Sequence, residues 1–301
     1  MTAPVDPNVA GYADWLRALA ADARFGADDR LGTANLIDRA ARRRAAAAIE
    51  EFEVMSLARP LVPHASVRGD GRPGFALEVF TVDGDEPFGS DHLELDCHGS
   101  HNTHLDALNH MGFDASWYGG RPVGAPDPPS VADLAEHGLV TRAVLVDIAR
   151  ARDCAWVDPS APVTGADIER ALAQGKADLA PGDGLLVYMG RDRFERAGHP
   201  FTSATSRAPR PGIGRDGARW IAESGVSVLG WDFLDAVHPD EPQCTVHLLQ
   251  WAIGLVLIDN CALGDAAHRL DQLGRATGAL VVAPLRLSGA TGCTVNPMLI
   301  V

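Results

Sequence analysis

Histidine is concentrated in one short stretch of the chain, residues 98–110, which read HGSHNTHLDALNH. The stretch holds four of the eleven histidines of the chain, together with Asp106. Imidazole and carboxylate are the protein ligands that suit zinc, manganese and iron. His104 and Asp106 are two residues apart, so an extended segment places both side chains on one side. The stretch therefore predicts a metal site or an acid–base site, rather than a hydrogen-bonded strand end with surface histidines.

Two common hydrolase motifs are missing from the sequence. It contains neither the H-E-x-x-H of zincin proteases nor the G-x-S-x-G turn that carries a serine nucleophile. His110 follows Asp106 by four residues, which is one helical turn if a helix begins near Asp106. The expected chemistry therefore uses imidazole and carboxylate groups.

Strands and helices alternate along the chain and must position this stretch. Residues 92–98 alternate between polar and apolar, which predicts a strand that delivers its end, with His98, to a site. Helices are expected at 11–21, 38–51, 164–174 (capped by Thr164), 216–224 and 244–252, and further strands at 75–82, 143–148, 184–189, 226–231, 254–259 and 280–287. This order indicates an α/β protein with a mixed β-sheet and flanking helices. We expect an N-terminal helical extension, residues 1–50, followed by one domain, residues 51–301.

Composition and charge exclude several classes of protein. A net charge of −14 argues against a nucleic-acid partner, because binding to phosphates requires a basic surface. No apolar run is long enough to cross a membrane, and no signal peptide is visible. The five cysteines are scattered and form no C-x-x-C pair, which suits a reducing compartment. We therefore expect a soluble, cytoplasmic protein without a membrane partner.

Two segments outside the histidine stretch have a possible place in the site. Trp117 and Tyr118, with the glycines that follow them, could form a loop that lines a pocket, or could be ordinary core or surface aromatics. Asp232 ends an expected strand, where α/β proteins place their sites. It could orient a ligand histidine or belong to a structural turn.

The segment THLDALNH, residues 103–110, resembles the H-x-G-T-H-x-D-A-P-x-H signature of the cyclase family of metal-dependent hydrolases. That family includes bacterial kynurenine formamidase, isatin hydrolase and trans-dienelactone hydrolase. FGADDRLGTAN (25–35), PGDGLLV (181–187) and His247 followed by IDN (258–260) resemble other family segments. The resemblance spans residues 25–265 and implies a swivelling β/β/α-type fold.

The resemblance also implies roles for individual residues. His104 and Asp106 match metal ligands, and His110 matches the histidine that acts as general acid and base. His247 and Asp259 match a second ligand pair, which completes a binuclear site in some members. Asp259 stands where glutamate is usual, so its shorter reach would weaken a second metal or leave only one. The implied cofactor is one or two divalent ions, zinc in the first place and manganese as the alternative.

The chain departs from the family signature at the first ligand. Family spacing places a histidine at position 100, where this chain has Ser100. His98 and His101 flank that position, and we favour His98 because an extended segment would put it on the face of His104 and Asp106. Asn102 and Leu108 also replace the usual glycine and proline, which indicates a branch with a different substrate.

The expected activity is hydrolysis of a small cyclic or aryl amide, such as a formamide or an imide, or of a lactone, by metal-activated water. Lyase or cyclase chemistry at the same site is one alternative, and a catalytically silent metal- or ligand-binding scaffold is another. The resemblance further implies a homodimer or homotetramer, with residues 6–43 as the candidate arm.

Overall fold

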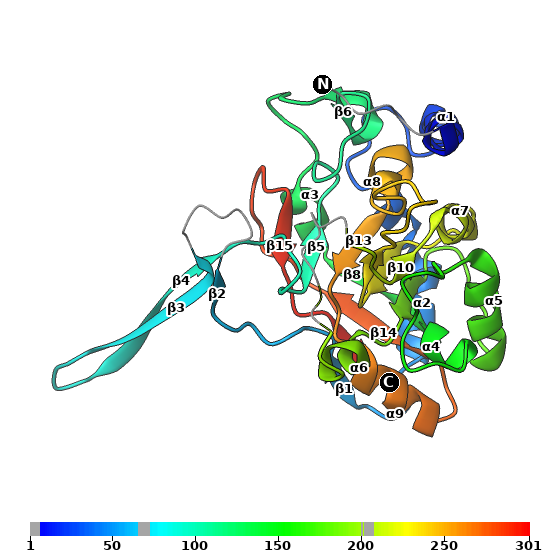
Figure 1. The fold of residues 1–301 in the computed structure, drawn as a ribbon. Coiled ribbons are helices and arrows are strands. Elements are labelled where there is room, and N and C mark those ends of the chain that lie inside the picture. Colours follow the sequence, from blue (N-terminus) through cyan, green and yellow to red (C-terminus); the bar gives the residue numbers. More distant parts are fainter. Residues whose placement is uncertain (1–6, 66–72, 200, 202–207) are drawn as a thin grey trace.

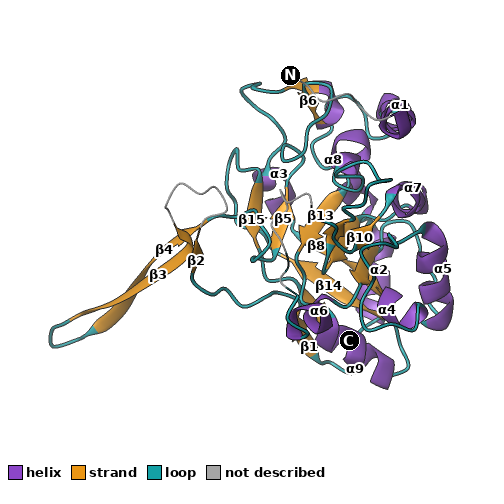
Figure 2. Ribbon diagram, in the orientation of Figure 1, coloured by secondary structure: helices purple, strands orange, loops and turns teal. Residues whose placement is uncertain are grey.

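A curved nine-stranded sheet flanked by helices forms the body of the protein, and a two-stranded ribbon projects from it (Figures 1 and 2). The computed structural model describes residues 7–65, 73–199, 201 and 208–301. The sheet is mixed, as the sequence predicts, and the α/β class with flanking helices is confirmed.

The sheet has its parallel strands in the middle and antiparallel strands at both sides. Its order is β1 (Val54–Ser56), β16 (Met298–Ile300), β14 (Thr277–Val282), β8 (Leu139–Asp147), β9 (Gly184–Tyr188), β11 (Val228–Trp231), β13 (Val256–Asp259), β5 (His104–Asp106) and β15 (Gly292–Thr294). Strands β8, β9, β11 and β13 are parallel to one another, and β5 runs antiparallel to both β13 and β15. The histidine stretch therefore enters the sheet close to one edge.

The helices cover both faces of the sheet. They are α1 (Pro7–Ala21), α2 (Arg39–Ala47), α3 (Val131–Ala135), α4 (Ile148–Ala151), α5 (Gly165–Gln174), α6 (Arg191–Arg196), α7 (Arg215–Ser224), α8 (Leu248–Ile253) and α9 (Gly264–Gln272), with short 3-10 turns at Gly32–Leu36 and Tyr118–Gly120. One core cluster joins α1, α4, α5, α7 and α8 to the sheet, and a second joins α3 and α9 to the opposite face. Alternate residues of the central strands supply the two clusters, as expected for a sheet buried on both sides.

Short strands complete the structure outside the main sheet. They are β2 (His64–Ala65), β3 (Pro73–Val82), β4 (Phe88–Leu95), β6 (Ser116–Trp117), β7 (Arg121–Pro122), β10 (Gly212–Ile213) and β12 (Leu234–Asp235). The hairpin β3–β4 is the projecting ribbon (Figure 1). Its base leads directly into the segment that carries His98.

The N-terminal helices pack against the body of the chain. The hydroxyl of Tyr12 on α1 donates to the carbonyl of Thr245, at 2.7 Å. The Arg44 guanidinium on α2 binds the buried Asp183 carboxylate, at 3.0 Å. Both predicted helices are thus present. The division between residues 50 and 51 into extension and domain stays a prediction.

Several predicted boundaries are wrong. The strand expected at 92–98 ends at Leu95, because Asp96 and the residues after it turn into a loop. The strand expected at 280–287 ends at Val282, since Pro284 cannot donate to a ladder, and it is followed by β15 and β16. The helix expected at 244–252 starts only at Leu248, after Cys244 with a positive φ of 56°. Thr164 caps α5 as predicted, in a capping box with Asp167.

In the part of the chain that the structure describes, no helix is both long enough and apolar enough to cross a membrane.

Candidate metal centre

The register between β5 and β13 brings His104, Asp106 and Asp259 to one place in the sheet. His104 pairs with Asp259, and Asp106 pairs with Leu257. Side chains alternate along a strand, so His104 and Asp106 point to one face while Leu105 enters the core. All three polar side chains are almost completely buried. A buried strand end with three ionisable groups needs compensating partners.

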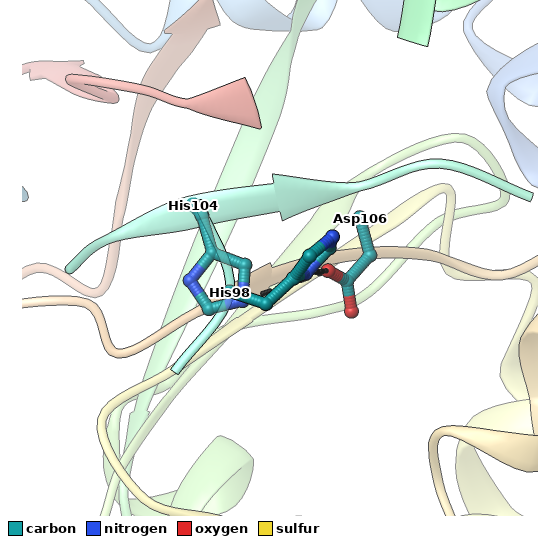
Figure 3. Close-up of side chains that lie close together, drawn as sticks. All are labelled: His98, His104 and Asp106. Carbon is teal, nitrogen blue, oxygen red and sulfur yellow. Dashed lines mark ion pairs between the residues drawn. The ribbon is translucent and has the colours of Figure 1, made fainter. Parts of the chain in front are cut away.

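The two oxygens of Asp106 face two different groups of histidines. Oδ1 lies 3.1 Å from Nδ1 of His98 and 3.5 Å from Nε2 of His104. Oδ2 lies 3.7 Å from Nε2 of His110 and 3.8 Å from Nε2 of His247. Figure 3 shows the first group, with His98 and His104 beside the Asp106 carboxylate below β5. Each group, three donor atoms from three side chains, has the separation needed to hold a metal ion.

For His104 and His247, the hydrogen bond made by Nδ1 determines whether Nε2, the nitrogen nearer Asp106, has a lone pair. Nδ1 of His104 lies 2.9 Å from the Asn102 carbonyl, which can only accept, so this nitrogen carries the proton. Nδ1 of His247 likewise contacts the Asp235 carboxylate. In the neutral rings both Nε2 atoms are therefore acceptors.

The Nε2 atoms of His104 and His247 face a carboxylate oxygen, which is also an acceptor. Nε2 of His104 lies 3.8 Å, and Nε2 of His247 3.1 Å, from Oδ2 of Asp259. Nδ1 of His98 and Oδ1 of Asp106 are buried and lie 3.1 Å apart, but they do not form a hydrogen bond with each other or with any other described residue. Lone pairs that converge in a buried space require a positive charge between them. The donor set, imidazole nitrogen and carboxylate oxygen, fits a divalent ion.

The neighbours of Asp106, His110 and His247 also shift the pKa values of these three side chains. Burial alone would raise the pKa of Asp106, but His110, His98 and His104 lower it well below its usual range. Burial lowers the pKa of His110 to about 4, against the opposing effect of Asp106. Burial also acts to lower the pKa of His247, but Asp235 and Asp259 raise it well above its ordinary value. Without a cation, the proton of His247 supplies the positive charge in this space, and a metal ion would have to displace it.

His110 comes from a turn, not from a helix. Its backbone N–H donates to the Ala107 carbonyl at 2.9 Å, directly after β5 ends. The ring stacks on His98, with centroids 4.0 Å apart. No helix begins near Asp106, so that assumption is wrong, but the turn still places the His110 imidazole beside the Asp106 carboxylate.

Of the two histidines beside Ser100, the structure brings His98 to the cluster. His98 reaches Asp106, and its Nε2 lies 2.9 Å from Oγ1 of Thr291. His101 stacks on His64 instead, with centroids 4.4 Å apart. The physical reason expected from the sequence is wrong, because residues 97–103 form a loop and not an extended strand.

Asp259 is held from two sides. Nε1 of Trp231 donates to its Oδ1 at 2.5 Å, and its Oδ2 faces His247. The sequence left open whether Asp232 orients a ligand histidine or belongs to a structural turn, and it is Asp235 that contacts His247. Asp232 accepts backbone N–H groups of Met189, Gly190, Arg191 and Phe233, which is the structural alternative. Gln250 also belongs to the site, because its Nε2 donates to Oδ2 of Asp106 at 3.3 Å. No spacing signal in the sequence could have identified Trp231, Asp235, Gln250 or Thr291.

The loop after Trp117 lies along a different cavity. Tyr118, Gly119 and Gly120 line a space of about 470 Å³ together with the N-terminal segment and α8. None of the residues of the metal cluster is among its lining residues. The predicted pocket loop thus lines a pocket, but not the one at the histidines.

Comparisons with known proteins agree with this architecture. A family model described as "Putative cyclase" matches residues 27–237. A crystal structure of a novel cyclase is similar over 95% of this chain and 99% of that chain, with 25% identity and a TM-score of 0.82. A comparison with curated proteins found no match.

Two isatin hydrolases share the fold at lower identity. An isatin hydrolase bound to the product analogue thioisatinate has 18% identity and a TM-score of 0.59, over 83% of this chain and 92% of that chain. Isatin hydrolase A from Labrenzia aggregata, bound to benzyl benzoate, has 19% identity and a TM-score of 0.56, over 85% and 95%.

Proposed function

The chain belongs to the Putative cyclase family, and we propose that it is a metal-dependent hydrolase of small cyclic or aryl amides, such as formamides and imides, or of lactones. The observation that carries this proposal is the convergence of imidazole nitrogens of His98, His104 and His247 on the buried Asp106 carboxylate. A family that contains metal-dependent hydrolases and a donor set that fits a divalent ion support the same conclusion.

His98, His104 and Asp106 would hold one ion, either zinc or manganese. Because the second oxygen of Asp106 faces His247, and Asp259 lies beside that histidine, these three residues would hold a second ion. The short Asp259 side chain is occupied by Trp231 on one oxygen, so we expect the second ion to bind more weakly. When bound, the metal lowers the pKa of a coordinated water from 15.7 towards ~7 and polarises the substrate carbonyl.

His110 is the proposed proton-transfer residue. Its ring is partly exposed, whereas His104 is almost inaccessible, and its low pKa leaves the imidazole free to accept a proton at neutral pH. It would take the proton of the attacking water and deliver it to the leaving nitrogen or oxygen, a contribution of roughly 10²–10⁴-fold.

Substitution of His110 separates this role from metal binding. We expect His110→Ala to keep the wild-type metal content, measured by elemental analysis, and to lose turnover. His268→Ala is the matched control, since that imidazole lies on the exposed α9 beside Gln272. Loss of metal from His110→Ala would make His110 a ligand, a role that its place beside Asp106 and His247 also permits.

A substrate panel in ¹⁸O-water tests the activity itself. An aryl formamide, an isatin-like cyclic amide and a lactone are incubated with the metal-loaded protein, before and after chelation. Hydrolysis requires ¹⁸O in the product carboxylate and loss of activity with the chelator. Product formed without label would favour lyase or cyclase chemistry, and bound metal without any turnover would favour a binding scaffold.

Self-association is a further part of the proposal. The projecting hairpin exposes Leu77, Val79, Phe80, Phe88 and Leu93, and an unsupported two-stranded ribbon is marginally stable in water. The hairpin is therefore a second candidate for the arm of a homodimer or homotetramer, beside residues 6–43. Light scattering of the purified protein tests this, with a monomeric mass as the contradicting result.

A further inference from the structure

Asn260, which follows the candidate ligand Asp259, makes a buried set of contacts with the loop that precedes His104. Its side chain is inaccessible to solvent, and its backbone has a positive φ of 57°. Asparagine tolerates this left-handed conformation better than most residues. The position thus allows the amide to point back from the end of β13 towards residues 99–102.

The orientation of the Asn260 amide is determined by its partners. Nη1 of Arg191 donates to Oδ1 at 2.6 Å, so this atom must be the oxygen. Nδ2 then donates to the carbonyls of Gly99, at 2.6 Å, and Asn102, at 3.1 Å. A flipped amide would set an N–H group against the guanidinium and an oxygen against two carbonyls. Only one orientation is compatible with the surroundings.

Arg191 is itself fixed. It is almost completely buried, and its second terminal nitrogen donates to the Ser100 carbonyl at 2.6 Å. Nη1 also donates to the Asp232 carbonyl, and Nε to the Glu195 carboxylate. A guanidinium with several simultaneous partners has little freedom to turn. Arg191 and Asn260 together hold three carbonyls of the loop, those of Gly99, Ser100 and Asn102.

The Asn102 carbonyl connects this network to the metal centre. It accepts from Asn260 and also from Nδ1 of His104, at 2.9 Å, so both of its lone pairs are used. The second bond decides that Nε2 of His104 faces Asp106 with a lone pair. Outer-shell bonds of this kind commonly fix the tautomer of a ligand histidine.

We propose that Asn260, held by Arg191, is a positioning residue that sets the tautomer and the orientation of His104 through the Asn102 carbonyl. The consequence for zinc affinity rests on the proposed metal-dependent function. The consequence for the tautomer does not, because it concerns the metal-free protein. The two can therefore fail separately.

Asn260→Asp is the informative variant. Aspartate keeps the shape, tolerates the positive φ and still accepts from Arg191, but it replaces the Nδ2 donor with an oxygen that repels both carbonyls. Asn260→Gly keeps the backbone conformation and deletes the amide, which covers the case that the aspartate variant fails to fold. Asn35→Asp is the matched control, since Asn35 also donates from Nδ2 to a backbone carbonyl, that of Gly32, but contacts no residue of the cluster.

Two measurements decide the proposal. In metal-free protein with ¹⁵N-labelled histidine, long-range ¹H–¹⁵N correlation reads the tautomer of His104, whose signal is the one missing from His104→Gln. We expect a single Nδ1–H form in the wild type and in Asn35→Asp, and a mixture in both Asn260 variants. Competition with a chromophoric chelator should show zinc affinity lowered roughly 10–100-fold in these variants and unchanged in the control.

The opposite results would overturn the role of Asn260. One is an Nε2–H form of His104 in the wild type. Another is a His104 tautomer and a zinc affinity that do not change in folded Asn260→Asp or Asn260→Gly. A wild-type protein that binds no zinc would contradict the proposed function, and the tautomer measurement alone would then decide the role of Asn260.

Discussion

His104, Asp106 and Asp259 stand on two neighbouring strands of the sheet, whereas His98 and His110 are carried by a loop and a turn. The strand-borne side chains are 2%, 0% and 4% exposed, and the loop-borne rings are 29% and 24% exposed. Ladder hydrogen bonds on both sides of β5 fix the first group, while the second depends on single contacts such as that between His98 and Thr291. We infer that the strand-borne ligands are held rigidly, whereas His98, the third proposed ligand, and His110, the proposed proton-transfer residue, have more freedom to move.

The largest effect is expected from Asp106→Asn. One oxygen of this carboxylate faces His98 and His104, the other faces His110 and His247, and asparagine removes its charge without changing its size. Zinc affinity should fall by at least about 1,000-fold, equivalent to roughly 4 kcal/mol. Titration calorimetry measures the affinity, and circular dichroism verifies the fold. A variant that still binds zinc within about tenfold of the wild type would refute a role for Asp106 as a metal ligand.

A matched pair of histidine substitutions tests the comparison directly. His104→Gln should lower zinc affinity by at least ten times more than His98→Gln, because the loop can place a water where His98 was, and the buried strand cannot. Both variants are titrated with zinc under the same conditions. Equal losses would show that the loop is as rigid as the strand and that the distinction fails.

The sequence could predict the strand-borne half because strand spacing is a local property. The separation of two residues between His104 and Asp106 is enough to place both on one face, whatever the rest of the fold does. The α/β class follows from the same kind of pattern, since each of the strands β8, β9, β11 and β13 is a short apolar run between turn or helix signals. The pairing of β5 with β13 places Asp259 beside His104, a position that only the family resemblance had indicated.

The loop-borne half was predictable in part only. His98 was the better choice over His101, but the loop of residues 97–103 is shaped by contacts with Arg191 and Asn260, which are distant in sequence. The sequence likewise could not decide between the two roles open to Asp232, or assign Asp235 to His247. Both end up buried, and β12 turns Asp235 towards His247 while Asp232 caps the amides after β9. Such outcomes depend on tertiary contacts that no local pattern contains.

His247, which precedes α8, is an intermediate case that depends on Asp235. Asp235→Asn should lower zinc affinity about 10–100-fold, because the amide no longer ensures that Nδ1 carries the proton. Asp183→Asn is the control, an equally buried carboxylate that binds Arg44 and Arg142 instead. It should reduce the melting temperature without changing the affinity. If Asp235→Asn lowered the melting temperature but bound zinc with the wild-type affinity, the role of Asp235 would be structural only.

The smallest effect is expected at the indole that holds Asp259. Trp231→Phe keeps an aromatic ring in the core and removes the donor to Oδ1, which is a hydrogen bond to a charged group. Such bonds contribute about 1.5–3 kcal/mol, equivalent to roughly 10–100-fold in affinity. Because the bond occupies Oδ1 of Asp259, we expect its loss to raise the affinity for the second ion by roughly tenfold, the lower end of this range, and that for the first ion by less. Trp220→Phe removes a comparable indole–carboxylate bond, to Glu169 at the surface, and should leave both affinities unchanged. Stepwise zinc titration resolves the two ions. A loss confined to the first ion would place Asp259 in the shell of His104 rather than that of His247, and the strand-borne group would then hold a single, more completely buried metal.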